Sequence, residues 1–478
     1  MQQFELAGSS GNGVVLTDAQ VTEFAGSLRG QLLREGDPGY DEARTIWNAM
    51  IDKRPALIAR CAGAGDVTRA VDFARRNRIV VSVRGGGHNI AGNAVCHRGL
   101  MIDLSLMKSV QVDPQKRTAQ VEPGVTLAEF DEKAQSHGLA TPLGINSTTG
   151  VAGLTLGGGF GWLTRKYGMT VDNLLGADVI TADGQLRHVS ANENPDLFWG
   201  IRGGGGNFGV VTRFEYQLYP VGPEIFSGLL VYSHEHAETV LKRYREVTRR
   251  APVDLTVWVV LRKAPPLPFL PEHVHGKEVV VLAVFYLGDA DSGQKAIQPL
   301  EESAPLVGKH VGPTPYTAWQ KAFDPLLTPG ARNYWKSHDF KEFSDDAIRK
   351  IVQYSGNLPT PHTEIFLGHI AGKMNSVPPE ATAYHHRNVN YVMNVHGRWD
   401  DRADDERGIR WAREFFQAMT PYSLGSVYVN FMTADEQDRV EAAYGQNYDR
   451  LVELKNKYDS SNLFCMNQNI KPVILEGR

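Results

Sequence analysis

Cysteine is scarce in this chain, with three residues in 478: Cys61, Cys96 and Cys465. They are too few and too scattered for a disulfide framework or a zinc site. The chain also lacks an apolar run of the roughly 18 residues that a membrane-spanning helix needs. Its first residues, Met1 to Glu5, lack the charged-then-apolar pattern of a signal peptide. We therefore expect no membrane partner and a cytoplasmic, bacterial location.

An excess of charge of either sign is absent as well. The chain has 50 lysines and arginines against 54 aspartates and glutamates, so its formal net charge is −4. It has no basic stripe and no alternation of basic and aromatic residues, so we expect no nucleic-acid partner. The pair His385-His386 has no third ligand near it in the sequence, and we expect no metal site.

Glycine, by contrast, is abundant, with 48 residues concentrated between positions 85 and 209. The first cluster is Arg84–Gly87, which follows a mostly β-branched run, Ile79–Val83, and precedes His88. The run is typical of a buried strand. Successive N–H groups in a glycine turn bind phosphate. The motif predicts a cofactor diphosphate at the turn and a reactive ring near His88, unless the turn is only a tight connection and His88 only a polar loop residue.

Two further glycine clusters follow the first. Seven of the 18 residues in Gly144–Gly161 are glycine, and the others are mostly small or apolar, unlike a flexible polar linker. Such a segment must pack against something flat. The third cluster, Gly203–Gly209, leads into a predicted strand, Val210–Leu218.

The composition changes after Pro220–Pro223, because the glycine clusters stop there. The predicted strands beyond this point are Ile225–Tyr232, Leu255–Leu261, Val279–Tyr286, Glu364–Ile370 and Asn390–Val395, and the predicted helices are His236–Arg250, Asp345–Tyr354 and Asp404–Ala418. This pattern is typical of an antiparallel sheet covered by helices. Near the end of the chain we predict a strand over Val427–Phe431 and a helix over Asp435–Leu454.

The three clusters in this order resemble the FAD-linked oxidases of the vanillyl-alcohol-oxidase/p-cresol-methylhydroxylase (PCMH) superfamily. The resemblance is carried by Val-Arg-Gly-Gly-Gly-His-Asn, then Gly-Val-Ala-Gly-Leu-Thr-Leu-Gly-Gly-Gly-Phe-Gly-Trp, then Gly-Gly-Asn-Phe-Gly-Val-Val-Thr. The tail contains Tyr-Val-Asn-Phe from Tyr428 and Asn-Gln-Asn-Ile-Lys-Pro from Asn467, and it is similar to the C-terminal segment of berberine-bridge enzymes.

The resemblance implies an α+β protein with two domains. A two-subdomain PCMH-type FAD-binding domain would span residues 1–220, with its core at about 53–220. An antiparallel-sheet substrate-binding domain covered by helices would span 221–425, and a berberine-bridge-type segment, 426–478, would return to the FAD-binding domain.

The resemblance also implies FAD as the cofactor, with the flavin 8α-methyl bonded covalently to His88. Many relatives add a second bond from a cysteine in a Gly-x-Cys-Pro motif. This chain has Asn146 at the cysteine position, so we expect attachment through His88 only. The other residues implied to bind FAD are Arg84, Gly85, Gly86, Gly87, Asn89, Gly92, Gly144, Thr148, Thr149, Gly150, Gly153, Gly158, Gly161, Gly209, Val210, Val211, Tyr428, Asn430, Asn467 and Asn469.

The implied reaction is hydride transfer from a C–H of an alcohol or amine to flavin N5, while a base takes the hydroxyl or amine proton. The candidate catalytic residues are Tyr428, Glu364 and His369. To act as a base at neutral pH, Tyr428 would need a pKa well below its usual value of about 10. The alternative is a structural tyrosine that closes the site. Thr149 stands where relatives use a valine or leucine to admit or obstruct dioxygen, and it favours O2 as the acceptor, giving H2O2.

The aromatic content after residue 220 predicts an aromatic, heterocyclic or secondary-metabolite-like small-molecule substrate. The alternatives are an oligosaccharide substrate, a flavin dehydrogenase with another electron acceptor, or a binding module that has lost catalysis. A dinucleotide-binding dehydrogenase is disfavoured, since its Gly-x-Gly-x-x-Gly motif opens a helix, whereas a strand is the next element after Gly85–Gly87.

Overall fold

The computed structural model describes residues 3–9 and 11–473. Near the N-terminus, three parallel strands and one antiparallel strand form a small sheet in the order β3 (Gln31–Leu33), β4 (Leu57–Arg60), β6 (Leu100–Asp103), β5 (Val81–Arg84). Helices α1 (Asp18–Ser27), α2 (Tyr40–Arg44) and α3 (Ala64–Asn77) and the hairpin β1 (Gln3–Ala7)–β2 (Gly13–Thr17) accompany it. Strand β5 ends where the first glycine cluster begins.

A second, antiparallel sheet has the strand order β11 (Leu186–Ser190), β10 (Leu174–Thr181), β12 (Gly209–Gln217), β8 (Thr118–Val121), β7 (Val110–Asp113). The helices between its strands are α4 (Leu127–Gln135), α5 (Val151–Leu156), α6 (Thr164–Tyr167) and α7 (Pro195–Ile201). Thr126 and Glu129 form the capping box of α4 that their spacing favours. Short strands β9 (Leu139–Ala140) and β13 (Tyr219–Pro220) pair beside this sheet.

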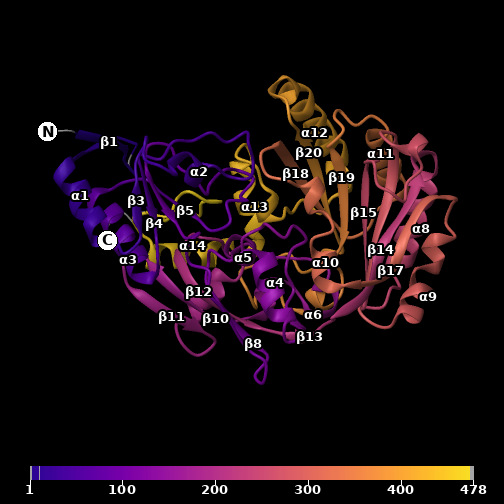
Figure 1. Cartoon of the computed structure of the whole chain (residues 1–478), viewed down its shortest axis with the longest axis horizontal. Coiled ribbons are helices and arrows are strands. Elements are labelled where there is room, and N and C mark those ends of the chain that lie inside the picture. The colour runs from indigo at the N-terminus through magenta and orange to yellow at the C-terminus, as the bar shows by residue number, and fades with distance from the viewer. Residues whose placement is uncertain (1–2, 10, 474–478) are drawn as a thin grey trace.

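A seven-stranded antiparallel sheet forms the other end of the molecule (Figure 1). Its strand order is β17 (Leu306–Pro315), β14 (Glu224–Ser233), β16 (Glu278–Tyr286), β15 (Leu255–Lys263), β19 (Glu364–His369), β20 (Tyr391–Trp399), β18 (Arg332–Phe340). Helices α8 (Ala237–Thr248), α9 (Ala290–Glu301), α11 (Asp345–Ser355) and α12 (Asp405–Met419) pack on one face, and α10 (Tyr316–Gln320) lies near α4. The α+β class and an antiparallel sheet covered by helices are as predicted, although β17, β18 and α9 were not among the predicted elements.

The C-terminal segment returns from the large sheet to the glycine-rich half (Figure 1). The strand expected over Val427–Phe431 is wrong: Val429–Phe431 is a single 3-10 turn. The expected helix is divided into α13 (Val440–Tyr444) and α14 (Tyr448–Tyr458), because Gly445 adopts a left-handed φ of 54° between them. No helix in the described ranges is long and apolar enough to cross a membrane.

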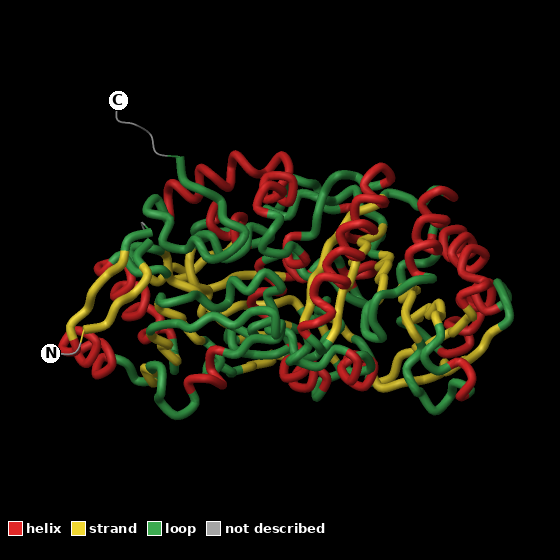
Figure 2. Tube along the Cα trace, turned by 90° about the horizontal axis from the view of Figure 1, so that it is seen from above, coloured by secondary structure: helices red, strands yellow, loops and turns green. Residues whose placement is uncertain are grey.

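Buried polar contacts join the large sheet to the glycine-rich half. Asp172 and Arg387 form a bidentate ion pair with N–O distances of 2.7 and 2.8 Å. The guanidinium of Arg165, on α6, donates to the carbonyls of Ala251, Pro252, Leu255 and Ala371. Figure 2 shows that mainly loops fill the region between the two halves. A cavity lies at this junction.

Candidate active site

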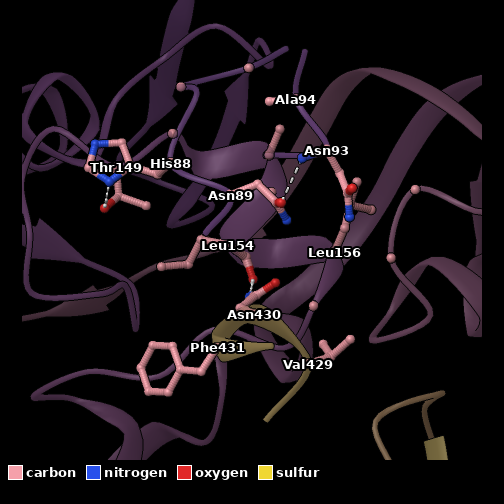
Figure 3. Close-up of a pocket in the computed structure, with 18 of the residues that line it drawn as sticks. His88, Asn89, Asn93, Ala94, Thr149, Leu154, Leu156, Val429, Asn430 and Phe431 are labelled. Carbon is pink, nitrogen blue, oxygen red and sulfur yellow. Dashed lines mark hydrogen bonds between the residues drawn. The ribbon is translucent and has the colours of Figure 1, made fainter. Parts of the chain in front are cut away.

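A cavity of about 340 Å³ lies between the glycine clusters and the large sheet. One wall is the turn after β5, a second is helix α5 with the loop before it, and a third is the start of β12. Strands β15, β18, β19 and β20 and the segment around Tyr428 close the other side. Segments far apart in the chain therefore meet here, and Figure 3 shows part of the lining.

His88 stands on the cavity wall, directly after the glycine turn. Its ring stacks on Trp47 with centroids 5.2 Å apart. Burial lowers the pKa of His88 to about 3, so the imidazole is neutral at physiological pH. A neutral ring has a nucleophilic lone pair, which an imidazolium lacks.

Thr148 fixes which ring nitrogen of His88 has that lone pair. Thr148 Oγ1 lies 2.9 Å from Nε2 and donates its own proton to the side-chain oxygen of Asn146 at 2.7 Å. Since a hydroxyl has one proton, Thr148 must accept from an Nε2–H. The lone pair then lies on Nδ1, 3.5 Å from Thr149 Oγ1. Asn146 thus holds Thr148, and Thr148 sets the tautomer of His88.

The glycines allow backbone segments to cross where side chains would not fit. A Cβ on Gly86 would lie 2.6 Å from the Cα of Gly150, so the first two clusters touch backbone to backbone. Gly87 has a φ of 71°, which disfavours any other residue. Gly153 is different, because a Cβ there would meet no atom within 4 Å, although the residue lines the cavity.

Two observations indicate that the residues lining the cavity fit FAD. Among the described residues, the backbone N–H groups of Gly86, Gly87 and His88 have no acceptor, as a turn that binds a diphosphate requires. Buried polar atoms on the cavity wall also lack partners within the described ranges: Asn93 Nδ2, Trp335 Nε1, Asn394 Oδ1 and Asn467 Oδ1. Such atoms are costly unless a ligand or water completes them, and a flavin ring has both donors and acceptors.

A buried ion pair forms the wall on the large sheet. The carboxylate of Glu364 accepts from Arg262 Nη1 at 2.9 Å and lies 3.1 Å from His396 Nδ1. Burial would raise the pKa of Glu364, but the Arg262 charge and the His396 contact outweigh it and hold the pKa at about 2. Burial lowers the pKa of His396, against the pull of Glu364. Glu364 is therefore a carboxylate at neutral pH.

Tyr428 lies in the cavity wall with its hydroxyl accepting two hydrogen bonds, from the N–H of Gly159 at 3.0 Å and from Asn430 Nδ2 at 3.0 Å. Burial raises the pKa of Tyr428 to about 12, although both donors lower it. The depressed pKa that a tyrosine base requires is not found. Asn430 also donates to the carbonyl of Leu154, so it links the C-terminal segment to α5 (Figure 3).

Most of the residues expected to bind FAD lie together on the cavity wall. These are Gly85, Gly86, Gly87, His88, Asn89, Gly144, Thr149, Gly150, Gly153, Gly209, Val210, Val211, Tyr428, Asn430 and Asn467. Thr148 lies just behind, in contact with His88. Asn146, at the position of the missing cysteine, also lines the cavity, whereas all three cysteines are free and lie elsewhere.

Other expected contacts do not line the cavity in the described chain. Arg84 donates instead to the carbonyl of Ala43. Gly92, Gly158 and Gly161 serve packing: a Cβ would strike Ile51, Met169 and Tyr384, or the carbonyl of Leu143, respectively. Asn469 is also away from the wall, and its Oδ1 is buried without a partner among the described residues.

His369 needs a correction as a catalytic candidate. Successive side chains of a strand point to opposite faces, so Glu364 and His369, five positions apart, cannot face the same side of β19. Glu364 faces the cavity, and the ring of His369 stacks on Tyr391 at 5.1 Å on the helix-covered face. His369 therefore cannot contact a substrate in this cavity.

Sequence reasoning missed some wall residues, notably Trp47 and His396. Trp335 also lines the cavity, and it belongs to the aromatic content after residue 220 that predicted a flat or apolar ligand. One signal was available for His396: Asn394, His396 and Arg398 alternate with other residues along the sequence, and polar side chains at every second position of a strand indicate one polar face. Trp47 stands in a segment with no such pattern.

These features define a flavin-binding domain with a seven-stranded sheet placed over its cofactor cavity. Comparison with known proteins agrees with a flavin-binding domain. Residues 55–190 match the "FAD binding domain" family, and residues 427–471 match the "Berberine and berberine like" family. An FAD-linked oxidoreductase of Dictyostelium discoideum is 32% identical over 460 residues, 95% of this chain and 97% of the relative. This chain belongs to the berberine-bridge-enzyme-like family of FAD-linked oxidoreductases.

Two further comparisons concern 6-hydroxynicotine oxidases. The (R)-6-hydroxynicotine oxidase of Paenarthrobacter nicotinovorans is 31% identical, with 93% of this chain and 97% of the relative covered. The crystal structure of 6-hydroxy-D-nicotine oxidase from Arthrobacter nicotinovorans superposes with a TM-score of 0.83 at 28% identity, covering 94% of this chain and 99% of that one. The expected family, fold class and FAD cofactor are thus confirmed.

Proposed function

We propose that the protein is an FAD-dependent oxidase of a small-molecule amine or alcohol, with O2 as electron acceptor and H2O2 as product. The observation that carries the proposal is the pairing, across one cavity, of a neutral His88 with a buried carboxylate, Glu364. Bound FAD would accept a hydride from the substrate C–H. The division of the chain at residues 220 and 425 into FAD-binding domain, substrate-binding domain and returning segment belongs to the same proposal.

His88 would hold the flavin through a single covalent bond from its Nδ1. Three features support this. The ring is neutral, its Nε2 proton is held by Thr148, and the position of a second attachment is Asn146, whose side chain has no thiol. The Gly86–His88 N–H groups would bind the diphosphate.

Glu364 would orient the substrate by accepting a hydrogen bond from its N–H or O–H group. Oxidation of an alcohol requires that its hydroxyl proton be removed to a base in the site. An amine that arrives as an ammonium ion can lose one proton to solvent before it binds, and the nitrogen lone pair of the neutral amine then assists hydride transfer from the adjacent carbon without a further base. A carboxylate with a pKa of about 2 accepts hydrogen bonds well and protons poorly, and Tyr428, with a pKa of about 12, stays a phenol. Both values favour an amine over an alcohol.

Dioxygen as acceptor is favoured by Thr149, which lines the cavity close to His88 and is similar to valine in shape. The relatives that are 6-hydroxynicotine oxidases also support a small molecule and an oxidase reaction. An oligosaccharide substrate and a dehydrogenase reaction are the alternatives that the test must separate.

The test has two parts. The absorbance spectrum of the purified protein is recorded before and after acid precipitation, for the wild type, for His88→Ala, and for His97→Ala as an exposed histidine control. We expect flavin in the precipitate of the wild type and the control, and extractable flavin in His88→Ala. Flavin that washes out of the wild type would contradict the covalent bond.

The second part measures peroxide release from amines, alcohols and oligosaccharides, alongside dye reduction without oxygen. Peroxide from an amine supports the proposal. Turnover of oligosaccharides alone, or dye reduction without peroxide, would assign one of the alternatives instead.

A further inference from the structure

A second, smaller cavity of about 60 Å³ adjoins the flavin cavity on the large sheet. The two share the wall residues Ile145, Trp258, Leu327, Glu364 and Phe366. The side pocket therefore begins at Glu364, where the proposed substrate nitrogen is held, and extends along the sheet away from His88.

The floor of this pocket is a grid of apolar side chains in register on three strands. Leu229 on β14 pairs with Ala283 on β16, which pairs with Trp258 on β15. One row further, Val281 lies between Val231 and Val260. Side chains at every second position share a face, so the whole grid faces the pocket.

The roof comes from two segments outside the sheet. The proline-rich loop 264–271 contributes Pro265, Leu267 and Leu270, and the segment before β18 contributes Phe323 and Leu326. Both segments are apolar where they line the pocket.

The only ionisable groups on the pocket wall, among the described residues, are Arg262 and Glu364, and they bind each other at 2.9 Å. A buried water needs two to four polar partners, and beyond the ion pair the only side-chain polar atom on this wall that lacks a partner among the described residues is Trp162 Nε1. Protein interiors contain few voids larger than a water molecule, so an apolar void next to a reaction site is available to an apolar ligand group.

We propose that this side pocket is a specificity subsite that takes an apolar alkyl or aryl substituent of the substrate, whose amine is held by Glu364. The inference rests on the proposed function for the role of Glu364. The subsite narrows the substrate class to amines with an apolar substituent. It disfavours oligosaccharides, because their hydroxyl groups would give up hydrogen bonds to water and find no partners along the row Leu229, Ala283 and Trp258.

The test is a calorimetric titration of the holoenzyme with 4-methyl-, 4-ethyl- and 4-propylbenzylamine. Burial of each added methylene is expected to tighten binding about fourfold. Leu229→Trp fills the pocket and should abolish this dependence on chain length while 4-methylbenzylamine still binds. Leu186→Trp makes the same change on the exposed strand β11 and should keep the wild-type dependence. If Leu229→Trp does not fold, Ala283→Val is used in its place.

Affinities that do not change with chain length in the wild type would overturn the proposal, as would an unchanged dependence in Leu229→Trp. Binding of cellobiose in place of the amines would overturn it as well. The titration is carried out under nitrogen with the flavin reduced beforehand by dithionite, so the enzyme holds no hydride acceptor and the heat reports binding alone. A protein that binds the series with the expected dependence but releases no peroxide would therefore keep the subsite and refute the oxidase reaction.

Discussion

The exchange Glu364→Gln tests the central electrostatic feature of the site. The side chain is buried and contacts Arg262 and His396 at 2.9 and 3.1 Å. These contacts hold the pKa at about 2, against a usual value of 4.5. Each unit of difference in pKa between the folded and the unfolded chain corresponds to about 1.4 kcal/mol of free energy of unfolding. The ionised carboxylate therefore stabilises the fold by about 3 kcal/mol at pH 7. Glutamine keeps the shape and loses this contribution.

The sign of the pH dependence follows from a depressed folded-state pKa. The stabilisation is complete above the unfolded pKa of 4.5 and is lost as the pH falls toward 2. The gap in free energy of unfolding between the wild type and Glu364→Gln should therefore be about 3 kcal/mol at pH 7 and shrink to about 2 kcal/mol at pH 3.5. Other carboxylates cancel in this difference.

Urea unfolding followed by circular dichroism at several pH values measures the gap. Glu406→Gln, an exposed residue paired with Arg410, is the control and should differ from the wild type by less than about 1 kcal/mol. If Glu364→Gln unfolds like the wild type, or if its deficit is the same at pH 7 and pH 3.5, the carboxylate is not held as the structure indicates.

Three further predictions concern the same framework. Asp172→Asn should lower the free energy of unfolding by about 3–5 kcal/mol, because it leaves the buried guanidinium of Arg387 without its charge partner. Asp196→Asn, in a more exposed pair with Lys457, is the control and should lower it by about 1 kcal/mol or less. Thermal unfolding measures both. Gly86→Ala should give little folded protein, because its Cβ meets the backbone of Gly150, while Gly153→Ala should fold normally but contain less flavin, as the ratio of flavin to protein absorbance will report. Tyr428→Phe should lower the free energy of unfolding by about 1–3 kcal/mol, because Gly159 and Asn430 lose the oxygen to which they donate. It should leave the pH profile of peroxide release unchanged between pH 6 and 9, because the pKa of Tyr428 lies near 12. A shifted profile would instead indicate that Tyr428 is the catalytic base.

The cofactor side of the site could be predicted from the sequence because its constraints are local. A backbone that must pass close to Gly150, or turn with the φ of Gly87, leaves glycines in the sequence, and they cluster. Five strands of the large sheet are equally visible, because their buried residues are β-branched or alternate. Strands β17 and β18 were not predicted, since β17 contains two glycines and two prolines and β18 carries several charged and polar residues. The break at Gly445 was missed, because one helix was predicted to run through it, although a glycine within a helical pattern marks a possible end.

The side of the cavity that the large sheet forms could not be predicted, because its contacts join distant residues. Arg262 and Glu364 are 102 positions apart, and only the pairing of β15 with β19 brings them together. The alternation rule shows that Glu364 and His369 lie on opposite faces, but it does not say which face meets the cavity. The segment Val427–Phe431 was mispredicted for a similar reason. Its alternating residues favour a strand, but the structure has a turn there, and the Tyr428 hydroxyl accepts hydrogen bonds from the distant Gly159 and from Asn430.

The same long-range contacts bear on how substrates are selected. Asp172 with Arg387, Arg165 with four carbonyls, and Asn48 with the backbone of Asn333 all cross the junction between the two halves, and all are buried. Opening the junction would leave these polar groups unpaired, at a cost of about 1–3 kcal/mol for each neutral group and more for the charged ones. A cavity fixed in this way resists a change of width. Under the proposed function, substrates would then be selected by the side chains of the large sheet that line the cavity and the side pocket, and a change of residue at those positions should change the substrate without weakening the flavin site.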